Sequence, residues 1–428
     1  MSLDRLALPA VIFLIAFLAY GSQLLLFPYL EPHPLKPDQT RNFNSLVVCI
    51  WITYARACFT DPGSVPDKWL LTLGASNKVE ALRQKHRWCR KCEAFKPPRA
   101  HHCKMCGRCI PKMDHHCPWT ANCVSHRTFP HFFRFLFYSV VSMVQLEYFL
   151  YVRAAVIWEN RNLPIYFGPT LTQMILLFVL SFVNSVTLLA LGILLARNIW
   201  CLGGNVTTIE GWELERHETL VYRARKHGGY LDGPDGTKIR IKKQEFPYDI
   251  GIYQNIKQGM GGNPFLWLWP FAATPSNDSG LDFETNGFED PLLSWPPPDP
   301  DRMPRSKIPK SYDKDFTYGD EPALDVERVS AFRRRQQEDF DRLAHGSSGT
   351  ILRRRVDSVS NEYENLHGSQ QPDIDNAGHD REGWRDSDGD RLDDFGVDEN
   401  AEVFYGDDIP LGELIRKRQA GSETKYQH

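Results

Sequence analysis

Apolar and polar positions divide the chain into two contrasting halves. Four apolar stretches in the first half approach the length that crosses a lipid bilayer. They run from Leu6 to Phe27, Phe43 to Phe59, Phe132 to Val152 and Pro169 to Ala196. The second and third are interrupted by charge, so a buried core helix is the competing interpretation for these two. The pattern predicts an α-helical polytopic membrane protein with four transmembrane helices.

The first stretch and the loop charges predict how the spans are oriented. The first stretch lacks a strong basic flank and a clear small-residue cleavage site, so we expect an uncleaved span and no signal peptide. The loop from Thr60 to His131 is rich in Lys and Arg, whereas the loops at 28–42 and 153–168 carry few. The positive-inside rule places the basic loop in the cytosol, and four spans then make both termini cytosolic.

The second half of the chain changes composition twice. Residues 197–270 keep aromatic and aliphatic side chains and are expected to pack on the spans. Within them, Gly233-Pro234-Asp235-Gly236 separates Tyr230-Leu231 from Ile239, which predicts a β-hairpin. Residues 271–428 are rich in Pro, Ser, Asp, Glu and Arg, which predicts a disordered tail. Asp386-x-Asp388-x-Asp390 lacks the Gly and Glu of a calcium loop and is assigned to that tail.

Charge and cysteine usage limit the functional class. The formal net charge of −3 over 428 residues makes no electrostatic case for nucleic acid, and no nucleic-acid partner is expected. Seven of the ten cysteines lie between residues 89 and 123. This is not the spread of a secreted disulfide scaffold, so the segment is expected to face a reducing cytosol. We detect no internal repeat in the sequence.

The cysteine-rich segment has the spacing of metal ligands. Two residues between cysteines let both thiolates reach one ion, and two tetrahedral zinc ions need eight N or S ligands. Seven cysteines and several histidines can supply them with one cysteine to spare. Spacing alone does not settle which groups complete each Cys-x2-Cys pair. The available groups are Cys89, Cys92, His101, His102, Cys103, Cys106, Cys109, His115, His116, Cys117 and Cys123.

Cys117 is the best candidate for the spare thiol, because it directly follows Asp114-His115-His116. A thiol beside an imidazole that a carboxylate can orient is the arrangement of an activated nucleophile. His115 is then the candidate base and Asp114 its orienting group. The alternative makes Cys117 a zinc ligand and His115 a surface residue. Eight ligands already exist without these two, which disfavours the alternative.

This constellation resembles the signature of the DHHC protein S-acyltransferases, the integral-membrane palmitoyltransferases, over roughly residues 1–270. The resemblance implies two interleaved Cys3His sites and leaves Cys117 uncoordinated. A closed four-ligand site has no open position for substrate, so both zinc ions are expected to be structural. One site would be Cys89, Cys92, His102 and Cys109, and the other Cys103, Cys106, His116 and Cys123.

Three further segments are similar to motifs of the same family. They are Asp61-Pro62-Gly63, Thr207-Thr208-Ile209-Glu210 and the stretch from Tyr248 to Asn255. Ser125-His126-Arg127-Thr128 departs from the family's Gly-x-x-Asn. Together with the Phe-Pro-His-Phe that follows, it resembles the fungal branch of the family, whose members reside in the endoplasmic reticulum. A multi-pass protein of that membrane is therefore expected.

The implied activity is transfer of a long acyl chain from palmitoyl-CoA, through a thioester on Cys117, to cysteines of membrane-associated proteins. The first alternative is a membrane-anchored zinc adaptor of the RING or LIM type, which has no need for a free cysteine beside Asp-His. The second is a transporter, which would need polar residues repeated along several spans, whereas only scattered ones are seen. Glu147 in the third stretch has no predicted role. Removing the tail after about residue 275 is expected to keep acyl transfer. The expected organisation is transmembrane helices 1 and 2 at 1–59, the zinc domain at 60–131, helices 3 and 4 at 132–196, the packing segment at 197–270 and the tail at 271–428.

Overall fold

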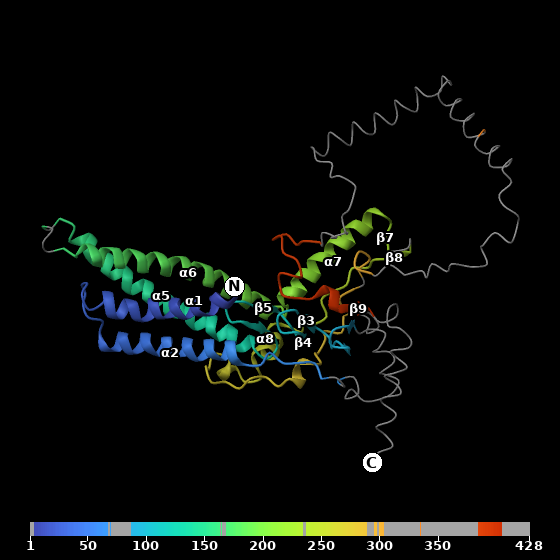
Figure 1. Cartoon of the computed structure of the whole chain (residues 1–428), viewed down its shortest axis with the longest axis horizontal. Helices are drawn as coiled ribbons and strands as arrows, with labels where there is room; N and C mark the ends of the chain where they lie inside the picture. The colour runs from blue at the N-terminus through green and yellow to red at the C-terminus, as the bar shows by residue number, and fades with distance from the viewer. Residues whose placement is uncertain are drawn as a thin grey trace, which may run out of the picture. The chain divides into compact units, whose positions relative to one another are not determined.

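Four long helices lie side by side, with short β-hairpins at one end of them (Figure 1). The computed structural model describes residues 4–66, 69, 87–162, 164, 168–233, 237–288, 295–297, 299–303, 334 and 384–404. The chain forms two compact units, and the description below concerns the first, residues 1–305 with 384–428. The helices are α1 (Asp4–Ala16) with its π-helical continuation η1 (Phe17–Leu26), α2 (Pro37–Phe59), α5 (Phe129–Glu159) and α6 (Leu171–Gly203).

Three of these helices are long and apolar enough to cross a membrane. They are Leu6–Leu26, Phe129–Glu159 and Leu171–Gly203, and they match three of the four predicted stretches. The remaining stretch, Phe43 to Phe59, lies in α2, which packs against α5. The first two turns of α2 contain Asp38, Arg41 and Asn44, and this polarity keeps α2 out of the set of apolar spans.

Polar side chains within the apolar segments of the helices bond to one another. Glu147 of α5, which had no predicted role, accepts hydrogen bonds from Asn184 Nδ2 (2.6 Å) and Ser185 Oγ (2.9 Å) of α6. Gln23 and Asn44 exchange hydrogen bonds between η1 and α2 at 2.9 and 3.0 Å. A polar group without a partner is costly in an apolar medium, so these pairs fix how the helices face one another.

The cysteine-rich segment folds as three consecutive antiparallel hairpins. They are β1 (Arg87–Cys89) with β2 (Ala94–Phe95), β3 (His101–Cys103) with β4 (Arg108–Ile110), and β5 (His115–Cys117) with β6 (Asn122–Val124). Cys89, Cys103 and Cys117 end the first strand of each hairpin and are spaced fourteen residues apart. The expectation of no internal repeat was wrong, because side-chain identity varies while backbone geometry recurs. The turns have positive φ at the same repeat position, in Glu93, Gly107 and Ala121.

The chain after α6 returns to the hairpins. It forms α7 (Thr208–Lys226), the predicted hairpin of β7 (Tyr230–Asp232) and β8 (Lys238–Arg240), and α8 (Ile252–Met260). The predicted turn residues 234–236 lie outside the described part. Short 3-10 turns follow at η4 (Pro264–Leu266), η5 (Asp278–Gly280) and η7 (Glu399–Ala401), and the last strand is β9 (Glu402–Phe404).

The prediction of a disordered tail from residue 271 is corrected for the described residues 271–288, 295–297, 299–303 and 384–404. Near the start of this region, Ala272 and Phe283 are buried. Leu392, Phe395, Val397 and Ala401 are buried, and β9 pairs with β1. The Asp386-x-Asp388-x-Asp390 run forms a tight turn, in which the Asp386 carboxylate accepts hydrogen bonds from two backbone amides. The prediction rested on the average composition of residues 271–428, which does not show the few apolar side chains of this short segment. The segment cannot fold alone, but it buries those side chains against the hairpins.

Candidate functional site

The hairpin repeat explains why two ligand sets interleave. Successive side chains of a strand leave opposite faces, and residues paired across two strands lie close together. His102 pairs with Cys109 in the second hairpin, and His116 pairs with Cys123 in the third. Each cross-strand pair meets the Cys-x2-Cys turn of the preceding hairpin. One metal site therefore forms between each two consecutive hairpins.

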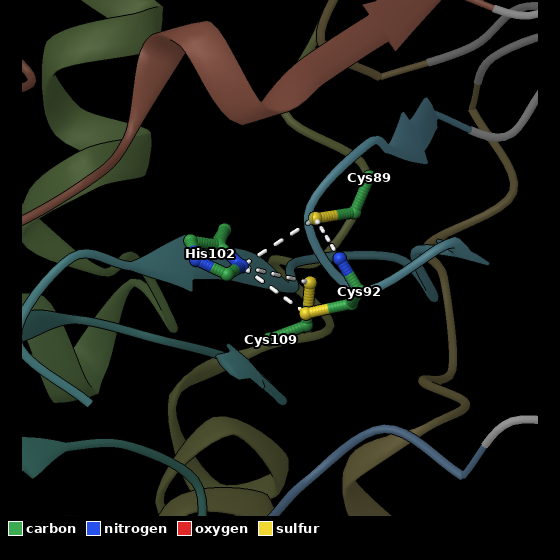
Figure 2. A group of neighbouring side chains, drawn as sticks. All are labelled: Cys89, Cys92, His102 and Cys109. Atoms are coloured by element: carbon green, nitrogen blue, oxygen red, sulfur yellow. Dashed lines mark hydrogen bonds between the residues drawn. The ribbon is translucent and has the colours of Figure 1, made fainter. Parts of the chain in front are cut away.

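The first site brings together the four residues of the first predicted set (Figure 2). His102 Nδ1 lies 3.4 Å from Cys89 Sγ, 3.2 Å from Cys92 Sγ and 3.9 Å from Cys109 Sγ. The Cys92 amide points at Cys89 Sγ at 3.4 Å, as expected for a turn that holds a thiolate. All four ligand atoms converge on one small volume.

The second site repeats this geometry with the other predicted set. His116 Nδ1 lies 3.6 Å from Cys103 Sγ and Cys106 Sγ and 3.5 Å from Cys123 Sγ. The ligand atoms within each set all lie within 4.8 Å of one another. A tetrahedral zinc ion with ordinary bond lengths separates its N and S ligands by about 3.6 Å. Both sets therefore could hold a metal ion, and their Cys3His chemistry fits zinc.

The third hairpin has the same turn but no metal set. Cys117 occupies the position of Cys89 and Cys103, while Thr120 stands where the other turns have their second cysteine. Within the part of the chain that the structure describes, no later hairpin supplies a His–Cys pair to this turn. At the other end of the repeat, the pair positions of the first hairpin hold Trp88 and Phe95, whose rings lie 4.8 Å apart. The repeat itself thus explains why Cys117, the predicted spare thiol, lies outside both metal sets. This structural reason was missed because the repeat was missed.

His115 and Cys117 share one face of β5, while His116 between them belongs to the second metal set. His115 Nδ1 lies 2.8 Å from Asp114 Oδ2, and a hydrogen bond links His115 to Cys117. The His115 ring also meets Phe132 of α5 edge-on at 6.0 Å. The structure therefore assembles the three predicted residues in the order carboxylate, imidazole, thiol.

Electrostatics at this trio favour a charged pair. Burial raises the pKa of Cys117, but the hydrogen bond and charge of His115, together with Thr120, lower it below its usual value. Burial lowers the pKa of His115, but Asp114 and Cys117 outweigh it and raise the pKa to about 10. Burial likewise raises the pKa of Asp114, and His115 and the Thr208 amide bring it below the usual range. The thiolate–imidazolium form is thus stabilised at neutral pH.

Asp114 is held in turn by the start of α7. Its second oxygen accepts a hydrogen bond from the Thr208 backbone amide. Thr207 and Glu210 cap this helix reciprocally, so the Thr-Thr-x-Glu motif acts as a capping box. The Glu210 carboxylate also bonds both Arg99 Nε (2.5 Å) and Arg99 Nη2 (2.7 Å), with both side chains almost fully buried. A buried ion pair thereby ties the loop before β3 to α7.

Two other segments noted in the sequence form hydrogen bonds and an ion pair around the hairpins. The Asp61 carboxylate accepts the Gly63 amide and pairs with Arg108 at 3.1 Å. Thr128, in the position of the family's Asn, donates to the Cys123 carbonyl at 2.6 Å and accepts the Ser125 amide at 2.9 Å.

Asn255 and Asn122 fix the site to the helix ends. Asn255 Nδ2 bonds the Gly203 carbonyl (2.6 Å) at the end of α6. Asn122 Nδ2 bonds carbonyls of Ala57 (3.0 Å) and Thr60 (2.8 Å), which docks the third hairpin on the end of α2.

A mostly apolar cavity of about 700 Å³ opens at Cys117 and runs between the long helices. Leu18 of η1, Phe43 of α2, Leu146 of α5 and Leu191 of α6 line it. Lys112, Arg197 and Asp394 lie among its polar lining residues. The cavity joins the Cys117 thiol to an apolar space between the helices that suits a long hydrocarbon chain.

Comparison with known proteins gives a consistent picture. Residues 82–215 match the family described as DHHC palmitoyltransferase. The chain is 53% identical over 437 residues to palmitoyltransferase pfa4 of Emericella nidulans, covering 100% of this chain and 98% of the relative. It is 53% identical over 426 residues to palmitoyltransferase pfa4 of Aspergillus fumigatus, covering 98% of each. It is 43% identical over 443 residues to palmitoyltransferase PFA4 of Gibberella zeae, covering 97% and 95%.

Proposed function

The chain belongs to the DHHC palmitoyltransferase family and is a protein palmitoyltransferase, and from this premise we propose that Cys117 carries the acyl group during transfer. The observation behind the proposal is that Cys117 shares a strand face with His115 at the mouth of the apolar cavity. The acyl donor is palmitoyl-CoA, whose chain enters the cavity while its polar head stays at the cytosolic side. Burying sixteen carbons stabilises such a complex strongly, at about 0.8 kcal/mol for each methylene.

The reaction proceeds in two half-steps. The Cys117 thiolate attacks the thioester carbonyl, a new C–S bond forms, and the bond to CoA sulfur breaks. The proton held by His115 goes to the departing CoA thiolate. Neutral His115 then takes the proton of an incoming substrate cysteine, whose sulfur attacks the acyl-Cys117 carbonyl and releases the Cys117 thiolate. Asp114 is the positioning residue that stabilises the imidazolium between these steps.

Two structural zinc ions complete the proposal. One is held by Cys89, Cys92, His102 and Cys109, and the other by Cys103, Cys106, His116 and Cys123; the convergence of these groups supports it. When bound, the ions supply rigidity, since the hairpins have few core side chains of their own. Because all four positions of each ion are filled by protein, the ions take no part in acyl transfer.

The proposed setting is the endoplasmic reticulum membrane, with α2 as a fourth span. The polar start of α2 lies at the helix end opposite the hairpins, where an interface accommodates charge. Arg56 near its other end bonds the Pro270 carbonyl at 2.8 Å, so its charge has a partner there. Four spans put the hairpins and both termini in the cytosol. The substrates are cysteines of membrane-associated proteins that reach this face.

The test is labelling of the purified protein with a palmitoyl-CoA analogue that carries a detectable tag. Wild-type protein should acquire a label that neutral hydroxylamine removes, because that reagent cleaves thioesters. Cys117→Ser should lose the label, whereas Cys58→Ser, which changes another cysteine outside both metal sets, should keep it. A hydroxylamine-sensitive label that persists in Cys117→Ser would contradict the assignment.

A further inference from the structure

The segment Trp384–Phe404, which we call the C-terminal clasp, crosses all three hairpins of the repeat. Phe395 O accepts a hydrogen bond from His116 N of the third hairpin (3.0 Å). Val397 forms a β-bridge with Cys103 of the second, and β9 pairs with β1 of the first. From its N-terminal to its C-terminal end, the clasp therefore contacts the third, the second and then the first hairpin. In Figure 1 it is the red segment that ends at β9.

The clasp is tied to the histidine of each metal set. The His116 amide donates to the Phe395 carbonyl, and three residues later the Asp398 amide donates to the His102 carbonyl at 2.9 Å. Further backbone bonds run from Lys104 N to Gly396 O (3.0 Å) and from Arg90 N to Ala401 O (2.8 Å). These contacts are made by main-chain atoms, so they hold the hairpin backbones in fixed relative positions.

Apolar packing and α7 anchor the same segment. Leu392 and Val397 are each 1% exposed and share a cluster with Ile110, Met113 and Trp212. The ring of Trp384 meets Trp212 edge-on at 4.9 Å, and Trp212 Nε1 donates to the Asp390 carbonyl at 3.3 Å. The clasp is thus a packed part of the hairpin domain, although a long stretch of chain separates it from β6.

The third hairpin needs such support more than the other two. Its turn, from Cys117 to Thr120, belongs to neither metal set, so no ion would fix the turn that carries the nucleophile. The clasp bonds the residue before Cys117, and Asp394 and Phe395 line the cavity into which Cys117 opens. Gly396 is packed so closely that an added Cβ would lie 2.8 Å from His116 Cβ.

We propose that the clasp is a positioning element for acyl transfer, which fixes the metal-free third hairpin and forms one wall of the cavity mouth. Phe395 and Gly396 act through His116 on the adjacent Cys117, so they are positioning residues. The inference rests on the proposed role of Cys117. It reverses the expectation that everything beyond residue 275 is dispensable for transfer.

Two truncations of the chain test the proposal at the level of the segment. A chain ending after residue 404 should keep wild-type self-acylation, and one ending after residue 383 should lose about ten-fold or more, since a displacement near 1 Å can cost more than that. The acyl-donor KM and the turnover number should both change in the shorter chain. Its zinc content should stay at that of the longer chain, because the clasp contributes no metal ligand. Equal or faster self-acylation after residue 383 would overturn the proposal, the faster rate indicating a block on the cavity.

A matched pair of glycines separates positioning from simple loss of folding. Gly396 and Gly389 both lie in the clasp with positive φ (80° and 87°). A Cβ added at Gly396 would contact His116, whereas a Cβ added at Gly389 would meet no atom within 4 Å. Gly396→Ala and Gly389→Ala in the full chain therefore impose the same kind of backbone strain, and only the first pushes on His116. Gly396→Ala should slow self-acylation and alkylation of Cys117 several-fold more than Gly389→Ala, with equal zinc content. Equal effects of the two would refute the positioning role. Absence of any label in wild-type protein would instead refute the proposed Cys117 thioester.

Discussion

His115 Nδ1 lies 2.8 Å from Asp114 Oδ2, and that carboxylate is shared with the first turn of α7. The pair controls how much of Cys117 is thiolate. The imidazolium lowers the pKa of Cys117, and Asp114 helps raise the pKa of His115 to about 10. The charge of Asp114 therefore affects the ionisation of Cys117, the proposed nucleophile, through His115.

Asp114→Asn should shift the pH dependence of Cys117 alkylation to higher pH. A neutral amide stabilises the imidazolium less, so the pKa of His115 falls and the pKa of Cys117 rises. The thiolate is the reactive form, and its fraction at neutral pH then decreases. The rate of reaction with iodoacetamide, measured from pH 5 to 10, reports this directly. An unchanged midpoint would show that Asp114 does not act through His115.

His115→Ala should slow self-acylation by about 10²–10⁴-fold, the usual effect of losing a general base. Zinc content should stay unchanged, because His115 belongs to neither metal set. Single-turnover labelling and metal analysis of the same sample provide both readouts. His126→Ala is a suitable control, since His126 is also buried near the cavity but contacts Ser279 instead of the trio. A comparable loss in both variants would argue against a special role for His115.

Thr120→Val should raise the pKa of Cys117 and slow acylation, whereas Thr120→Ser should resemble the wild type. Thr120 stands at the metal-free position of the third turn, and its hydroxyl helps to lower the pKa of the thiol. Valine keeps the shape but removes the hydroxyl, and serine keeps the hydroxyl. The alkylation profile separates the two substitutions. Identical profiles for valine and serine would exclude a contribution from the hydroxyl.

Cys89→Ser should reduce the zinc content from two ions per chain to one and destabilise the hairpin domain. The matched control is Cys49→Ser in α2, which lies outside both sets and should keep two ions. Metal analysis of the purified proteins and thermal unfolding in detergent measure the two effects. One ion in the wild type, or an iron–sulfur absorbance, would contradict the two-site proposal.

Arg99→Ala should lower the free energy of unfolding by about 3–5 kcal/mol, because it leaves the Glu210 carboxylate buried without its partner. The Arg223–Asp301 pair is about as short, at 2.6 Å, but its side chains are 45% and 41% exposed. Arg223→Ala should therefore cost less than about 1 kcal/mol. Denaturant unfolding of both variants provides the comparison. Similar losses would mean that burial does not set the strength of the Arg99 contact.

Spacing and the family resemblance together predicted much of the site. Spacing identified the Cys-x2-Cys pairs, and the resemblance divided the ligands into two sets, each of which the structure brings together. The hairpin at residues 230–240 was predicted correctly from its turn residues. Three of the four apolar stretches formed helices of spanning length. The span predicted at Phe43 to Phe59 remains a prediction, since the polar start of α2 lowers the hydropathy of that helix.

By itself, the sequence determined which residues carry the chemistry, because metal ligands, turns and an Asp-His-x-Cys order are encoded over a few positions. Only the tertiary structure decided how those residues are held. The Thr208 amide lies 94 residues from Asp114 in the sequence, and no local sequence pattern predicts that contact. The clasp is farther still, since the long helices α5 and α6 lie between His102 and Asp398 in the sequence. Such contacts depend on the path of the whole chain and on apolar surface that a short segment can bury only against a folded partner.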